Sequence, residues 1–251
     1  MHKPPVLTVL LSHQRPAQLE PVLKHWSRLV GDDSLLLTYG GLVQDFAQIT
    51  FPNKAFIDDE RLRVRDQQRQ FQSWRAVLRA GLEWLRTRPS YEFVHLTEYD
   101  HISLIDDLHH RMLNRAVAEK ADIIAHHLHR IDDTNHPQYL FHSCQPRFHR
   151  HFASISRRED KQVILSMLPT GSFWTREAFE AIASREEPIP VYVELYLPTL
   201  AHHLGFRVRE FTDQNPWVLA SGDRIDEVNT AGKAGAWTLH PVKTFRQELI
   251  R

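Results

Sequence analysis

Two carboxylic acids lie two residues apart in the segment Glu98-Tyr99-Asp100, directly after the apolar run 91–97. Side chains alternate along a strand, so both carboxylates can face one site. Hard oxygen ligands of this kind hold a divalent cation beside a diphosphate. The alternative is a solvated strand end that caps the helix expected near Ile105. For a pattern this short, both interpretations remain open.

A third acid, Glu194, lies in the first turn of a helix that we expect after Pro190. The helix dipole stabilises a carboxylate there as the anion, which suits a general base. The alternative is a favourable first-turn glutamate with no catalytic role.

His240 and Lys243 lie three residues apart near the C-terminus. A neutral imidazole is a good ligand for a transition metal. A lysine nearby can reach a phosphate group as a point charge. An ordinary His-Pro turn in a surface tail is the alternative.

The loop Ser12–Arg15 follows the first expected strand, which is the usual place for nucleotide contacts in an open α/β sheet. The loop has neither the glycine pattern of a dinucleotide fold nor that of a P-loop. The sequence therefore disfavours those two classes of nucleotide-binding protein.

Histidines and arginines gather in two further places. The histidines between His126 and His151 show no zinc-ligand spacing, so we interpret them as solvated or structural. A basic stretch that includes Arg69 either steers a phosphate-bearing ligand or pairs with the neighbouring acids. Its arginines are residues 61, 63, 65, 69, 75 and 79.

The elements that must position these residues alternate between strand and helix. Apolar runs predict strands at 6–11, 34–39, 91–97, 122–128 and 206–211, and a short one at 47–51 or 54–57. Helical spacing predicts helices at 16–30, 66–86 and 105–120, one capped by Thr175, and one from Pro190 to Gly205. The opening β-α-β order predicts a right-handed crossover and parallel strands.

Residues 130–168 are expected to be rich in loops, and the chain from about residue 221 to form an irregular tail. The predicted fold is therefore α/β: a single domain with a mostly parallel central sheet flanked by helices. We expect a catalytic domain at 1–220, divided into halves at 1–125 and 126–220. The tail at 221–251 is expected to act as a lid.

Composition limits the function classes. Lys plus Arg and Asp plus Glu both number 31, so the formal net charge is zero, which argues against a general nucleic-acid binder. The single cysteine, Cys144, fits a reducing compartment. The apolar run Val6–Leu11 is too short for a signal peptide or a spanning helix. We expect a cytoplasmic protein without a transmembrane segment, and peripheral membrane contact stays compatible with the sequence.

The order of these segments resembles the family 2-like nucleotide-sugar glycosyltransferases of GT-A fold, over about residues 6–243. The strand end Ser12–Pro16 is similar to the opening of that family, and Glu98-Tyr99-Asp100 looks like a variant of its D-x-D motif. Segment 171–179 resembles its small-residue loop and helix start, and segment 193–207 the part that holds the catalytic acid. His240 falls where many members carry a late histidine.

The resemblance implies a UDP- or GDP-type sugar donor, a Mn²⁺ or Mg²⁺ ion, and an acceptor that the sequence does not identify. It implies that Asp100 and His240 bind the metal and that Glu194 deprotonates the acceptor hydroxyl in an inverting displacement. The donor-binding residues that it implies are Ser12, His13, Arg15, Arg69, Glu98, Gly171, Ser172 and Lys243.

Two other functions remain open. One is a nucleotidyltransferase of similar fold, against which the absence of glycine in residues 12–16 counts. The other is a non-catalytic relative that binds a sugar nucleotide or a partner protein.

Overall fold

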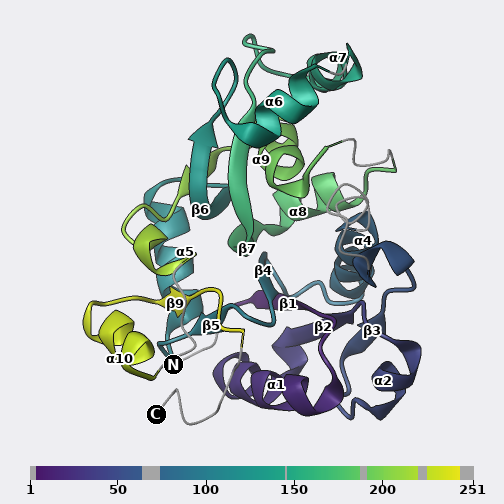
Figure 1. The fold of residues 1–251 in the computed structure, drawn as a ribbon, viewed down its shortest axis with the longest axis vertical. Coiled ribbons are helices and arrows are strands. Elements are labelled where there is room, and N and C mark those ends of the chain that lie inside the picture. The colour runs from purple at the N-terminus through teal and green to yellow at the C-terminus, as the bar shows by residue number, and fades with distance from the viewer. Residues whose placement is uncertain (1–3, 64–73, 145, 187–190, 220–224, 244–251) are drawn as a thin grey trace.

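The computed structural model describes residues 4–63, 74–144, 146–186, 191–219 and 225–243 (Figure 1). Within these ranges, seven strands form one sheet in the order β3-β2-β1-β4-β7-β6-β8. Helices pack against it, so the mixed α/β fold with a mostly parallel central sheet is confirmed.

Four strands at one side of the sheet run parallel. β1 (Val6–Ser12) lies between β2 (Leu35–Tyr39) and β4 (Phe93–Glu98), and β3 (Lys54–Phe56) pairs with β2. The helix α1 (Pro16–Val30) connects β1 to β2 as predicted. Both strands are almost entirely buried, which explains their continuous apolar sequences.

β7 (Leu165–Thr175) breaks the parallel pattern. It runs antiparallel to both neighbours, β4 and β6 (Ile123–Arg130), and β8 (Val208–Glu210) then pairs parallel to β6. Our expectation of loop at 130–168 and at 171–174 was wrong here. Pro169 and Gly171 interrupt the apolar pattern of this strand, and the β6–β7 register shifts on either side of His126.

The sheet separates two layers of apolar core. Leu7 and Val9 of β1 face one layer, which also contains residues of α4 (Trp74–Arg86), α8 (Arg176–Ala183) and α9 (Val193–His203). Val6 and Leu10 face the other layer, which contains residues of α1 and α5 (Leu108–Ala118). Alternate residues of one strand thus serve opposite faces, as the strand period requires.

Several helix predictions are confirmed in detail. Thr175 caps α8 by accepting a hydrogen bond from Ala178 N at 3.3 Å. Gly205, which follows α9, has φ of 101°. The predicted start of the helix at 66–86 lies outside the described residues, because the described part, α4, begins at Trp74.

Among the described residues, four α-helices lie where we predicted none: α2 (Val43–Gln48), α6 (Pro137–Ser143), α7 (Pro146–Ile155) and, in the tail, α10 (Ile225–Lys233). Figure 1 shows α6 and α7 at the end of the molecule opposite α1 and α2. Short 3-10 turns occur at η1 (Asp32–Ser34), η2 (Glu60–Arg63) and η4 (Asn215–Trp217).

The C-terminal tail is more regular than we expected. It contains α10 (Ile225–Lys233) and β9 (Thr238–Leu239), and β9 pairs antiparallel with β5 (Ile102–Ser103). A small apolar cluster anchors it: Ile102, Val228, Ala231, Ala236, Leu239 and Val242. Because β5 begins two residues after Asp100, this pairing brings the tail beside the acidic motif. Its division from 1–220 and its action as a lid stay predictions.

No helix in the ranges given above combines the length and apolar character needed to cross a membrane.

Candidate functional site

A cavity of about 390 Å³ lies at the carboxyl ends of β1 and β4. This is the sheet edge where open α/β proteins bind their ligands. Segments that are distant in sequence meet there, among them the end of β1, the end of β4, the middle of β7, the start of α9 and the tail. The lining includes the predicted site residues Ser12, His13, Glu98, Asp100, Glu194, His240 and Lys243.

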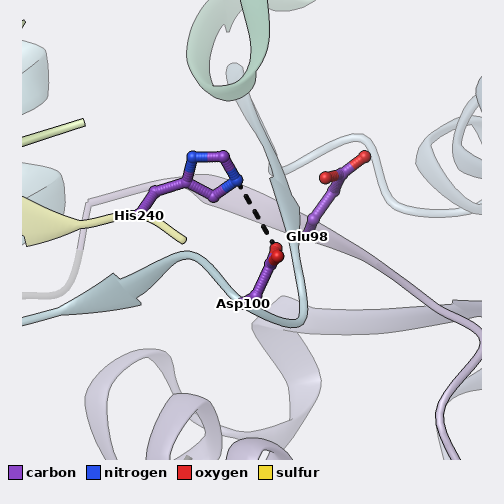
Figure 2. A group of neighbouring side chains, drawn as sticks. All are labelled: Glu98, Asp100 and His240. Atoms are coloured by element: carbon purple, nitrogen blue, oxygen red, sulfur yellow. Dashed lines mark ion pairs between the residues drawn. The ribbon is translucent and has the colours of Figure 1, made fainter. Parts of the chain in front are cut away.

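Glu98, Asp100 and His240 each bring one potential ligand atom to within 4.8 Å of the other two. In Figure 2, His240 faces Asp100 from the tail, with its Nε2 3.5 Å from Asp100 Oδ1. Oδ1 is buried and has no hydrogen-bond partner among the described residues. A buried carboxylate oxygen of this kind fits the ligand set of a divalent cation, and the imidazole suits a transition metal such as Mn²⁺.

The two acids of the motif ionise differently. Burial favours the neutral form of Asp100, but His240 and Lys243 outweigh it and hold the pKa of Asp100 below its ordinary value. Burial, together with Asp100 and Glu194, raises the pKa of Glu98 to about 8 against the opposing effect of Lys243. Glu98 therefore carries a proton at neutral pH, which it would release on ligating a metal.

Lys243 forms an ion pair with the other oxygen of Asp100, Oδ2. Burial is the largest single effect and opposes its charge, but the hydrogen bond and negative charge of Asp100, with Tyr99 and Glu98, together raise the pKa of Lys243. Its Nζ lies 5.8 Å from the centre of the Tyr99 ring. Val242 N donates to Asp100 O at 2.7 Å, so the backbone next to Lys243 is fixed to the acidic motif.

Glu194 enters the cavity from the first turn of α9. Burial raises the pKa of Glu194, although its own backbone N–H opposes this. A raised pKa brings a carboxylate nearer to the value at which a general base works best at neutral pH. Glu194 is close enough to Glu98 for its charge to raise the pKa of Glu98.

Thr170 and His101 support the acidic motif from behind. Glu98 N donates to Thr170 Oγ1 at 3.0 Å, and His101 Nδ1 lies 3.2 Å from the same oxygen. His101 N also donates to Glu98 O at 3.0 Å. Gly171 has φ of 76°, and a Cβ there would lie 2.2 Å from His101 Cε1. The ring of His101 thus needs a glycine at this position.

Three of the remaining predicted residues, Arg15, Gly171 and Ser172, do not line the cavity. Gly171 and Ser172 lie behind it: Ser172 is buried and accepts a hydrogen bond from Trp174 Nε1 at 2.7 Å. Arg15 occupies the N-cap position of α1. Arg69 falls outside the described residues. A role for these four in donor binding stays a prediction.

Of the lining residues that were absent from our predicted site, three carry an aromatic ring or a hydroxyl group: Tyr99, Trp74 and Thr170. Tyr99, whose ring lies edge-on to His13 at 5.3 Å, stands between the two acids of the motif. Its position between the two acids could have identified Tyr99 as a lining residue from the sequence. Trp74 reads as one more apolar residue of a helix, and Thr170 lies in the strand that we missed, so no sequence signal pointed to either.

Comparisons with known proteins identify no family for this chain. No protein-family model and no curated protein matches the chain. Among solved structures, the crystal structure of A197 from STIV matches 81% of this chain and 79% of its own. The identity is 10% and the TM-score 0.37, values at which the likeness supports no conclusion about function.

Proposed function

We propose that the protein is a metal-dependent glycosyltransferase that moves a sugar from a nucleotide-sugar donor to an acceptor hydroxyl with inversion. The observation that carries this proposal is the meeting of two kinds of group in one cavity. One is the cluster of Glu98, Asp100 and His240 with Lys243, and the other is Glu194.

The metal site is formed by Asp100 and His240, with Glu98 beside them. A Mn²⁺ or Mg²⁺ ion bound there supplies the positive charge that stabilises a departing diphosphate. Lys243 adds a second positive charge from the tail. Ser12 and His13, at the end of β1, contact the nucleotide.

Glu194 acts as the general base. Its carboxylate takes the proton of the acceptor hydroxyl while the acceptor oxygen bonds to the sugar carbon and the bond to the diphosphate breaks. We place the acceptor beside β7 and α9, on the 126–220 side of the cavity. Attack from the face opposite the leaving group inverts the configuration of that carbon.

A thermal-shift panel of UDP- and GDP-sugars with and without Mn²⁺ tests the proposal. A donor at 100 times its dissociation constant should add about 2.7 kcal/mol of stability. We expect a shift that requires both donor and Mn²⁺, and Mn²⁺-dependent donor hydrolysis. If no donor shifts the melting temperature, the proposal is wrong. Binding without turnover would support the non-catalytic relative, and turnover of a nucleoside triphosphate with a sugar phosphate would support the nucleotidyltransferase.

A further inference from the structure

Lys243 and Asp100 form an ion pair whose two partners differ strongly in burial. The side chain of Asp100 is 2% exposed, and that of Lys243 is 59% exposed. A buried carboxylate needs a positive partner to offset its lost hydration. The lysine, in contrast, can leave the carboxylate and remain hydrated, because its stem is flexible and already reaches solvent.

The same carboxylate belongs to the candidate metal group. Asp100 Oδ2 faces the ammonium of Lys243, and Asp100 Oδ1 faces His240. An ammonium and a divalent cation on one small carboxylate repel each other, and repulsion is strong where water is largely excluded. Asp100 therefore cannot hold both at full strength.

The tail keeps the lysine within reach of this carboxylate. The hydrogen bond from Val242 N to Asp100 O fixes the backbone beside Lys243, and the Val242 side chain is buried. The ammonium can move about its stem, between Asp100 and the part of the cavity beside Tyr99.

We propose that Lys243 is a built-in counter-ion of Asp100 that competes with the divalent cation for this carboxylate. The ammonium leaves Asp100 when an anionic group of the ligand, such as a diphosphate, takes it. The inference rests on the proposed function, because it requires the metal site. Beyond the proposed function, the inference implies that the cation alone binds weakly. It also implies that the cation and the diphosphate strengthen each other's binding.

Calorimetric titration with MnCl₂ alone, with no nucleotide, tests the competition. Lys243→Met removes the ammonium but keeps an unbranched side chain, and we expect it to bind Mn²⁺ about tenfold more tightly than the wild type. Lys243→Arg keeps the positive charge and should retain the weak affinity. Lys233→Met, at the end of α10, makes the same change of net charge outside the cavity and should also bind as the wild type does.

Two results would overturn the inference and leave the proposed function standing. In the first, the wild type binds Mn²⁺ and Lys243→Met binds it equally or less tightly. In the second, Lys233→Met tightens binding as much as Lys243→Met, which would make net charge the cause. If neither the wild type nor Lys243→Met binds Mn²⁺, the metal site of the proposed function fails together with the inference.

Discussion

At the residue scale, burial and neighbouring charge give similar carboxylic acids different states. Asp100 faces His240 and Lys243 and stays ionised, whereas Glu98 and Glu194 share a cavity wall and take up protons more easily. These differences are consistent with the separate tasks that we propose for the three acids. An acid with a lowered pKa suits a metal ligand, and an acid with a raised pKa suits proton transfer.

Asp100→Asn should remove most Mn²⁺ binding, at least about tenfold in affinity, because the amide carries no charge for the cation. The fold should survive, since Lys243 is exposed enough to remain hydrated without its partner. Titration calorimetry with MnCl₂ measures the affinity, and a thermal melt checks the fold. The control is Asp106→Asn, an acid that lies outside this cavity. Unchanged affinity in Asp100→Asn would remove Asp100 from the metal site.

Glu194→Gln should keep donor binding and lower transfer by about 10²–10⁴, the usual contribution of a general base. The donor-induced thermal shift and the rate of sugar transfer are measured on the same preparations. Glu177→Gln serves as control, because Glu177 is exposed in the first turn of α8, away from the cavity. Normal transfer, or a product that retains the donor's configuration, would place the base elsewhere.

The sequence was enough to identify Glu98, Asp100, Glu194 and His240 as candidate site residues, because each lies at an expected strand end, helix start or turn. Whether they meet in space depends on pairings such as β5 with β9, which join residues far apart in the chain. The pattern of polar and apolar residues does not indicate which distant segments pair with each other. The hydrogen bond between Glu98 and Thr170 could not be predicted from the sequence for the same reason.

At the element scale, the strands that we predicted are those in which the buried residues are also apolar. β1 and β2 are covered on both faces and read as continuous apolar runs. β7 is equally buried, but its polar and small residues face partners inside the protein, as Ser172 faces Trp174. In α6 and α7, His142 is buried and His149 and His151 are half-buried, so polar residues stand where the helical pattern would require apolar ones.

Gly171→Ala should destabilise the protein by more than roughly 2 kcal/mol, because the new Cβ would meet His101 and the positive φ disfavours alanine. Gly232→Ala is the matched control: this glycine lies in α10, is exposed, and has no atom within 4 Å of the added Cβ. It should be neutral, or stabilising by up to about 1 kcal/mol. Chemical denaturation measures both variants. Equal effects would contradict the packing of His101 on Gly171.

At the scale of the whole molecule, the 17 histidines are a dominant compositional feature, and many are buried. Burial lowers the pKa of His25 and His142 to about 4 and that of His126 to about 3. These rings are neutral in the folded protein but take up protons in the unfolded chain below an ordinary pKa of 6.5. Acid therefore favours unfolding through each of them, while Glu98, with its raised pKa, acts in the opposite direction.

His126→Leu isolates one such contribution. In the wild type, the destabilisation from His126 begins as the pH falls below 6.5 and grows until the pH reaches its folded pKa of about 3. Between about pH 7.5 and about pH 5 it amounts to about 2 kcal/mol. The variant should therefore lose about 2 kcal/mol less stability over this interval, whatever its stability at neutral pH. Urea denaturation at both pH values measures this, and parallel curves for the two proteins would contradict it.

The position of β7 between β4 and β6 affects how the sheet assembles during synthesis of the chain. A nascent chain released from the ribosome only as far as residue 164 contains β1 to β6 but not the strand that joins β4 to β6. Both strands then present an unpaired edge, which is open to other chains. Until β7 emerges, these edges expose the growing polypeptide to aggregation, and a chaperone that covers them would protect it.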